Sequence, residues 1–145
     1  MKKIFTKICI ASDHAGYRLK EKIKDYLIDK SISVIDLGPF SGNSVDYPDY
    51  AKKVAKRLIL KKSDAGILVC GSGTGMAITA NKFKGIRAAQ CYSKLSTILS
   101  RQHNNSNIIC LGSRMLKYKE SLKYVTYFLN TKFEGGRHQT RINKI

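Results

Sequence analysis

Two kinds of apolar pattern alternate along the chain, and this alternation restricts the fold more than any other feature. Five short runs are almost continuously apolar and rich in β-branched residues, at 8–11, 34–37, 65–70, 86–90 and 108–111. Such runs are typical of strands that are buried on both faces of a parallel sheet. Helical periodicity lies between them, with short links. Five such units predict a doubly wound, Rossmann-like three-layer α/β/α sandwich around a five-stranded parallel sheet.

Apolar stripes at helical spacing separate the strand-like runs. One stripe at 19–27 follows the first run, and a second at 50–59 begins just after Pro48. Proline suits the first turn of a helix because its missing N–H has no partner to lose there. Further helices are predicted at 75–82, 93–102 and 119–130. With 145 residues, no internal repeat and no linker, we expect a single domain at 1–145.

The chain is strongly basic, with 27 Lys and Arg against 10 Asp and Glu and a net charge of +17. Such an excess suits partners that are nucleic acids, anionic lipids or phosphorylated metabolites. The lysines are dispersed rather than gathered in one arm, which favours solvated helix faces. Because there is no helix-turn-helix, RRM or zinc signature, we expect no nucleic-acid partner. A basic nucleic-acid-binding module remains a distant alternative.

Composition also bears on the compartment and on metal binding. No stretch approaches the ~18 apolar residues of a membrane span, and Lys7 and Asp13 interrupt the basic start before it resembles an export signal. The four cysteines form no Cys-x-x-Cys pair and no zinc spacing with the three histidines. Cys9 and Cys110 lie within apolar runs and are expected to be structural thiols. We therefore expect a cytoplasmic protein with no membrane partner and no zinc site.

Polar and glycine residues gather directly after the strand-like runs. They occupy 12–16, 38–47, 71–75, 91–93 and 112–114. In open parallel sheets the working site lies beyond the carboxyl ends of the strands. We therefore expect the site at this rim of the sheet.

The sharpest local motif is Cys-Gly-Ser-Gly-Thr-Gly at 70–75, which follows a buried run. Alternate glycines let a backbone turn present several N–H groups to an anion at a helix N-terminus. Met76 stands where a dinucleotide fingerprint needs glycine, and no Gly-Lys-Ser/Thr of a P-loop follows. The motif therefore predicts an anion-binding turn (the anion cradle) that is neither a dinucleotide fingerprint nor a P-loop. The alternative is a tight turn that binds no ligand.

Several reactive side chains accompany this motif, each with a structural alternative. Cys70 is either a thiolate supported by the turn and by Ser72 or a satisfied structural thiol. The Asp13-His14 pair suits proton transfer or helix capping, and His103 is a candidate imidazole or a helix-end cation. Arg137 and Arg141, four residues apart, suit a phosphate monoester or a surface tail. Together they suit proton abstraction beside a carbonyl in a phosphorylated substrate.

Seven motifs in this order then carry a resemblance that covers about 7–142. They are Ser-Asp-His-Ala-Gly at 12–16, Asp-Tyr-Pro at 46–48, Cys-Gly-Ser-Gly-Thr-Gly-Met at 70–76, Ala-Asn-Lys at 80–82, Ser-Arg-Gln-His-Asn at 100–104, Gly-Ser-Arg at 112–114 and Glu-Gly-Gly-Arg-His-Gln-Thr-Arg at 134–141. The sequence closely resembles the type B ribose-5-phosphate isomerases, whose family includes galactose-6-phosphate and allose-6-phosphate isomerases. The resemblance implies interconversion of ribose 5-phosphate and ribulose 5-phosphate through a cis-enediolate, without metal or cofactor.

The resemblance also implies catalytic roles. Cys70 moves the proton between C2 and C1, and Ser72 supports this base. One branch of the family places Glu just after the glycine loop, but here the residue is Met76, so Cys70 is the only matching base. His103 opens the furanose ring, with Asp13 assisting.

The same resemblance implies the groups that bind substrate. Backbone N–H groups of the glycine turn hold the enediolate oxygens, from Gly71 and Ser72 through Gly73 and Thr74 to Gly75. Other positions match phosphate and sugar contacts. These are His14, Arg114, Arg137 and Arg141 for the phosphate, and Tyr47 and Asn104 for the sugar.

The family works as a homodimer, often paired into a tetramer, with active sites shared between subunits. The resemblance therefore implies that Cys70 and His103 of one site come from different chains. Pocket depth decides between a pentose and a hexose phosphate, so allose-6-phosphate or galactose-6-phosphate isomerase stays the alternative. A sugar-phosphate sensor without turnover is a third reading, against which the intact Cys70 and His103 argue.

Overall fold

The computed structural model describes residues 3–145 and contains one sheet. All strand pairs are parallel, and the order is β2-β1-β3-β5-β4. The strands are β1 (Ile8–Ser12), β2 (Val34–Asp36), β3 (Ala65–Cys70), β4 (Ala88–Gln90) and β5 (Ile108–Gly112). The predicted five-stranded parallel sheet is confirmed. The fourth strand is shorter than predicted, because Ile86 and Arg87 precede the residues that pair with β5.

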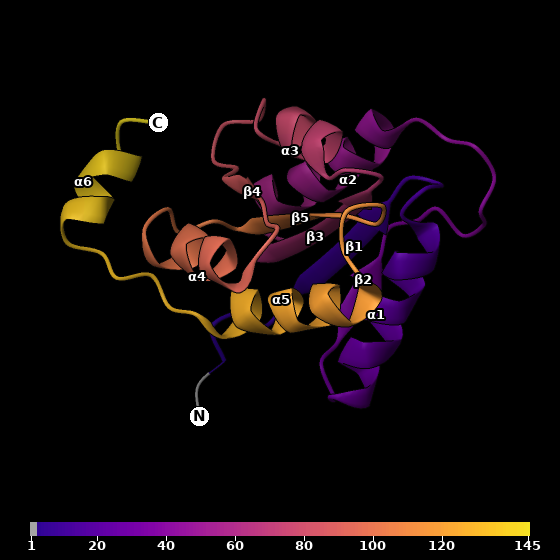
Figure 1. The fold of residues 1–145 in the computed structure, drawn as a ribbon. Coiled ribbons are helices and arrows are strands. Elements are labelled where there is room, and N and C mark those ends of the chain that lie inside the picture. Colours follow the sequence, from indigo (N-terminus) through magenta and orange to yellow (C-terminus); the bar gives the residue numbers. More distant parts are fainter. Residues whose placement is uncertain (1–2) are drawn as a thin grey trace.

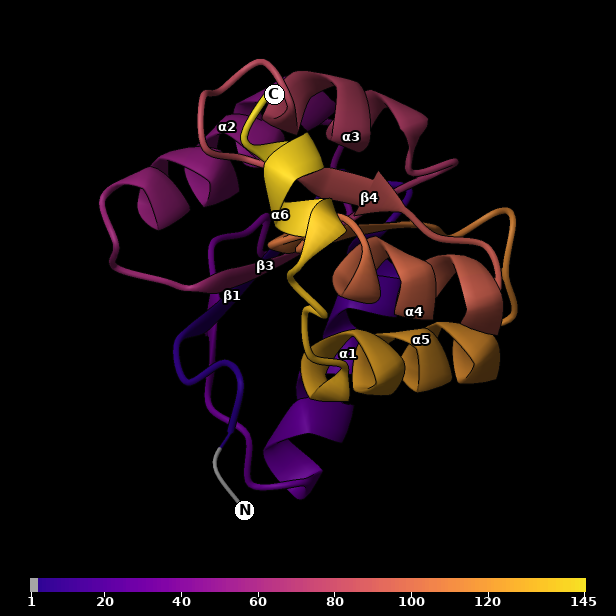
Figure 2. The same cartoon turned by 90° about the vertical axis from the view of Figure 1, so that its left-hand side faces the viewer.

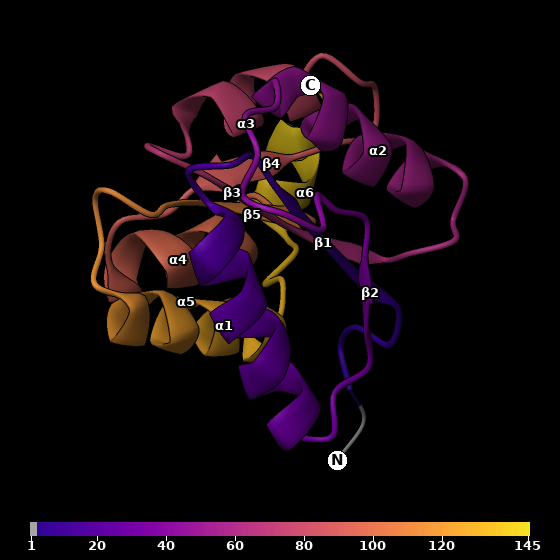
Figure 3. The same ribbon diagram turned by 90° about the vertical axis from the view of Figure 1, so that its right-hand side faces the viewer.

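Helices cover both faces of the sheet, as Figures 1 and 3 show. The helices are α1 (Tyr17–Asp29), α2 (Tyr47–Ile59), α3 (Thr74–Ala80), α4 (Lys94–Gln102), α5 (Tyr118–Asn130) and α6 (Arg137–Ile142). α2 and α3 lie on one face, and α1, α4 and α5 lie on the other. The short α6, which no apolar stripe predicted, stands away from both layers beyond α4.

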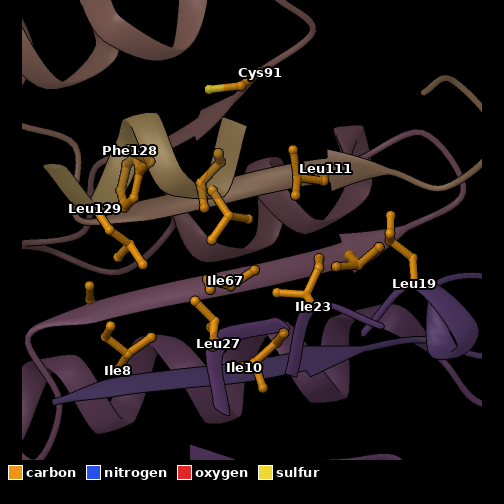
Figure 4. Close-up of a cluster of buried hydrophobic side chains, with 14 residues drawn as sticks. Ile8, Ile10, Leu19, Ile23, Leu27, Ile67, Cys91, Leu111, Phe128 and Leu129 are labelled. Atoms are coloured by element: carbon orange, nitrogen blue, oxygen red, sulfur yellow. The ribbon is translucent and has the colours of Figure 1, made fainter. Parts of the chain in front are cut away.

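The core consists of two apolar clusters, one on each face of the sheet. Ile8 and Ile10 point toward α1 and α5, whereas Cys9 and Ala11 point toward α2 and α3. This alternation follows from the two-residue period of a strand. Figure 4 shows the first cluster, in which Phe128 packs with strand isoleucines. All five residues of β1 and β5 and all six of β3 are buried, as expected for central strands of a parallel sheet.

Two of the four cysteines have the structural role that their positions predicted. Cys9 and Cys110 are fully buried in β1 and β5. Burial raises the pKa of the Cys9 thiol to about 11 and that of Cys110 well above its ordinary value, because a thiolate is poorly solvated there. Both groups therefore remain neutral thiols at physiological pH.

Within residues 3–145 no helix combines the length and the apolar character that a membrane crossing requires.

Candidate active site

The glycine turn lies at the centre of the sheet, between the end of β3 at Cys70 and the start of α3 at Thr74. Gly73 adopts a left-handed backbone (φ 82°) that favours glycine, and its N–H donates to Cys70 Sγ at 3.1 Å. A donated hydrogen bond stabilises negative charge on the sulfur. Cys70 is 5% exposed, so its thiol lies at the mouth of the turn and largely shielded from solvent.

The Ser72 hydroxyl contacts the backbone of the turn, and its support of the base stays a prediction. The hydroxyl accepts a hydrogen bond from the N–H of Thr74 at 3.2 Å, so it closes the turn itself. The donor on the sulfur is the Gly73 backbone. Two N–H groups of the predicted cradle are thus already engaged, those of Gly73 and Thr74.

Two larger side chains lie directly against the glycine turn. A Cβ at Gly71 would come within 3.2 Å of Arg114 Nη1, and one at Gly75 would collide with the ring of Tyr47. The absence of side chains at these glycines therefore lets a guanidinium and a phenol ring reach the backbone of the turn. Both groups belong to the predicted substrate contacts, and the structure brings them together with Cys70.

Asp13 and His14 follow β1 at the same rim. Asp13 is 7% exposed, donates its N–H to Val69 O at 3.1 Å and accepts the Gly16 N–H on Oδ1 at 2.9 Å. One carboxylate oxygen thus holds the turn that leads into α1, whose N-cap is Gly16 and has no side-chain cap. The His14 ring is anchored through Nδ1, which lies 3.1 Å from Val45 O and 3.2 Å from Val45 N.

The sequence interpretation missed Gln90, at the end of β4. Its Nε2 donates to Ser72 O at 2.9 Å and to Thr74 Oγ1 at 2.6 Å, so it holds the glycine turn from the edge strand β4, which β5 separates from β3. The available signal was a polar residue at the end of a predicted strand. Ser113 similarly ties two loops of this rim, because its Oγ donates to Ala15 O at 2.8 Å.

A second group of candidate residues lies elsewhere. His103 is the C-cap of α4, and Asn104 follows it in the turn that leads to β5. The His103 ring stacks on His138 with centroids 4.1 Å apart and planes 13° apart. Arg137 and Arg141 lie one helical turn apart on α6, and both are exposed.

The two groups lie at opposite ends of the strands, one at the carboxyl ends and the other at the amino ends. Cys70 pairs with Gly112 at the carboxyl ends of β3 and β5, whereas His103 precedes Ile108, which pairs with Gly66 at the amino ends. Four residues of strand separate these ends by about 13 Å. In Figure 1 the loop after β5 lies at one end of the sheet and α6 lies beyond the other, and Figure 2 shows α6 in front of β4. One chain therefore does not bring His103, Asn104, Arg137 and Arg141 to Cys70.

The second group includes three potential metal ligands, namely His103, Glu134 and His138, whose ligand atoms lie within 4.8 Å of one another. Glu134 Oε2 is 3.7 Å from His138 Nε2. The lone pairs of an imidazole lie in its ring plane, and these two planes are nearly parallel. The rings therefore do not converge on one ion as they stand, and the arrangement is a stack rather than a metal centre.

The electrostatics of His138 agree with this interpretation. Desolvation is the main cause that lowers its pKa, followed by His103 and Arg137. Glu134 acts in the opposite direction, and Arg141 lowers the pKa least. A positively charged surrounding disfavours a further cation and favours an anion. The phosphate-binding role of the exposed Arg137 and Arg141 in this region stays a prediction.

Comparison with known proteins agrees with this geometry. A family model described as Ribose/Galactose Isomerase matches residues 8–145. A Mycoplasma genitalium protein named probable ribose-5-phosphate isomerase B is 49% identical over 142 residues, which cover 95% of this chain and 92% of that protein. The crystal structure of a Thermotoga maritima ribose 5-phosphate isomerase superposes with a TM-score of 0.94 at 51% identity and covers 96% of each chain.

A further solved structure contains a sugar phosphate. It is the ribose-5-phosphate isomerase B of Mycoplasma genitalium with bound ribulose 5-phosphate, with a TM-score of 0.90 and 47% identity over 95% of this chain and 92% of that one. The family match, the sequence identity and the superposition all extend over nearly the whole chain. The chain therefore belongs to the Ribose/Galactose Isomerase family.

Proposed function

We propose that this protein is an aldose–ketose isomerase that interconverts ribose 5-phosphate and ribulose 5-phosphate. The observation that carries the proposal is the thiol of Cys70, which receives the Gly73 N–H at 3.1 Å in a turn flanked by Tyr47 and Arg114. The ribulose 5-phosphate bound to the Mycoplasma genitalium relative supports the choice of sugar phosphate.

The reaction transfers one proton between adjacent carbons. The Cys70 thiolate removes the proton from C2 of the open-chain aldose, the C2 electrons form a C1–C2 double bond, and O1 takes up negative charge or a proton. Within the cis-enediolate the O2 hydroxyl proton passes to the neighbouring O1. The ketose forms when O2 becomes the carbonyl oxygen and Cys70 returns the carbon-bound proton to C1. Oxidation at C2 and reduction at C1 balance within the same molecule, so the chemistry itself requires no redox cofactor, and we propose that none is used.

The turn would stabilise the charge that develops on the enediolate. Backbone N–H groups aimed at a developing oxyanion contribute about 2.7–4 kcal/mol per donor. Because Gly73 and Thr74 already donate within the turn, the N–H groups of Gly71, Ser72 and Gly75 are the candidates for this role. The Tyr47 ring beside Gly75 would limit the space available to the sugar.

Ring opening and phosphate binding would use the remaining residues. His103 would move the proton of the furanose hydroxyl, and Asp13 would assist. The phosphate would bind cationic and imidazole groups, because bidentate guanidinium contacts match a phosphate monoester. These groups are His14 and Arg114 from one edge and Arg137 and Arg141 from the other.

We further propose a homodimer or tetramer in which two chains share each site. The proposal is supported by the opposite positions of Cys70 and His103 on the sheet and by the exposed arginines of α6. A second chain would bring His103, Asn104, Arg137 and Arg141 to the rim that carries Cys70. The reducing cytoplasm is the proposed location, since all four cysteines are free thiols.

A hexose 6-phosphate isomerase is the second candidate, because the matching family model includes galactose isomerases. The decisive experiment compares kcat/KM of the purified protein for ribose 5-phosphate, allose 6-phosphate and galactose 6-phosphate. We expect ribose 5-phosphate to be preferred by at least about tenfold, since one extra carbon in a fitted pocket costs about 1–3 kcal/mol. A preference for a hexose phosphate would contradict the proposed substrate, and no turnover of any of the three would contradict the proposed reaction.

A further inference from the structure

Arg101, near the end of α4, is a buried cation that the reaction scheme does not use. It is 3% exposed, and no carboxylate among residues 3–145 forms an ion pair with it. A buried charge is costly unless hydrogen bonds compensate it. Three oxygens do so here: Nε donates to Thr131 O at 3.0 Å, and Nη1 donates to Asn105 Oδ1 at 3.0 Å and to Ser106 O at 2.5 Å.

These acceptors belong to two separate segments. Asn105 and Ser106 lie in the turn that follows His103, while Thr131 is the C-cap of α5, where the chain leaves for α6. A backbone bond adds to this junction, because the Glu134 N–H donates to Gln102 O at 3.1 Å. The guanidinium thus joins the turn that carries His103 to the tail that carries His138 and the two arginines of α6.

A second arginine donates to the same turn. Arg87, just before β4, donates from Nε to Asn104 O and to Asn105 O, both at 3.1 Å. Asn105 itself has φ 46°, a left-handed conformation in which asparagine is the commonest residue after glycine. The segment from His103 to Ser106 therefore follows an unusual backbone path between two guanidinium groups, and the stacking of His103 on His138 depends on that path.

We propose that Arg101 is a positioning residue for the ring-opening step, because it fixes His103 relative to the C-terminal tail. This inference rests on the proposed function, in which His103 opens the furanose ring. Lysine cannot replace arginine in this role. Its ammonium is a single point of donation, whereas the planar guanidinium reaches acceptors on two segments at once.

The test separates ring opening from proton transfer at carbon. Ribose 5-phosphate is largely cyclic, so its isomerisation requires ring opening, whereas ribulose 5-phosphate cannot form a furanose and reaches Cys70 in open-chain form. For Arg101→Lys we expect kcat for ribose 5-phosphate to fall about tenfold or more, since small displacements of a catalytic group are costly. The exchange of the C1 hydrogen of ribulose 5-phosphate in D₂O should stay within about twofold of wild type.

Two further variants complete the experiment. Arg57→Lys is the matched control, because Arg57 is a partly buried arginine in α2 whose Nε donates to Ser63 Oγ at 2.9 Å, away from the His103 turn. It should leave both rates unchanged. Asn105→Gly permits the positive φ but removes one acceptor of Arg101. It should therefore show the same selective loss of kcat for ribose 5-phosphate, to a smaller extent. If Arg101→Lys does not fold, Asn105→Gly decides the question.

The outcomes distinguish the two proposals. If the wild-type protein does not isomerise ribose 5-phosphate, the proposed function fails. If the wild type is active but Arg101→Lys loses neither rate, or loses both rates equally, Arg101 has no specific role in ring opening.

Discussion

At the scale of single residues, the environments of the four cysteines separate the candidate base from the others. Burial raises the pKa of Cys9, Cys91 and Cys110, which keeps these thiols neutral. Only Cys70 both ends a strand at the glycine turn and accepts a backbone N–H, from Gly73. A nucleophile or base needs this combination of a charge-stabilising donor and access from the rim.

Cys70→Ser tests this distinction. Serine keeps the size of the side chain but is a much weaker acid, so kcat should fall by about 10²–10⁴-fold while KM changes little. Steady-state kinetics on ribose 5-phosphate would measure both parameters. Cys91→Ser is the control, since Cys91 Sγ already has polar neighbours in Ala89 O and Ser100 Oγ and lies outside the proposed chemistry. Near-normal turnover of Cys70→Ser would exclude the thiol as the base.

The residues around Cys70 show which parts of the site the sequence could predict and which it could not. Alternate glycines after a buried run predicted the turn correctly, because that spacing is typical of a tight turn between a strand and a helix. The Gly73 donor on the sulfur and the Gln90 bonds to the turn were not predictable. Backbone N–H directions and contacts between residues 16 and 18 apart in sequence depend on the assembled sheet, so they leave no periodic signal.

At the scale of secondary-structure elements, a buried ion pair fixes α1 against the end of β2. Lys20 has no exposed surface, and its Nζ lies 2.8 and 2.7 Å from the two carboxylate oxygens of Asp36. Lys24 Nζ is 3.0 Å from the same carboxylate, and the Gly38 N–H donates to it at 2.9 Å. The Gly38 carbonyl in turn accepts the Ser12 N–H, so hydrogen bonds connect the ion pair to the residue that precedes Asp13.

The same ion pair makes stability depend on pH. Burial by itself would raise the pKa of Asp36, but the bonds from Lys20, Gly38 and Lys24 outweigh it and hold that pKa below its ordinary value. The folded state therefore gains stability from ionised Asp36 at all pH values above about 4, the pKa of an unfolded aspartate. This stability is lost as the pH falls further toward the lowered pKa of the folded state.

Asp36→Asn should therefore destabilise the protein by about 3 kcal/mol at neutral pH, which is the lower end of the cost of breaking a buried ion pair. The lower end applies because Lys20 still has Glu21 as a partner, at 3.0 Å. Urea unfolding at pH 7 and at a pH below the lowered pKa of folded Asp36 would measure the difference. The two proteins should converge at low pH, where wild-type Asp36 also becomes neutral. Asp29→Asn, an exposed position at the end of α1, should have no such effect. An equal loss of stability at both pH values would contradict the role of the charge.

At the scale of the whole molecule, the sequence predicted the layers but not the location of all site residues. The apolar alternation determined the sheet, because strands buried on both faces leave a continuous pattern. Strand ends then grouped Asp13 and Arg114, which follow β1 and β5, with Cys70, which ends β3. His103 follows a helix instead, and a helix that starts at the carboxyl edge of a sheet ends near the amino edge. That geometry, rather than any motif, separates His103 from Cys70.

The separation leads to a prediction about pairs of inactive chains. Cys70→Ser and His103→Asn should each have little activity alone, yet refolding them together in equal amounts should restore it. In a symmetric dimer, random pairing makes about half of the dimers mixed, and each mixed dimer has one intact site of two, so about a quarter of wild-type activity is expected. A refolded mixture of Cys70→Ser with Cys70→Ala is the control, since no pairing of these chains creates an intact site. If the first mixture recovered no activity although mass spectrometry showed mixed dimers, Cys70 and His103 would not act in one shared site.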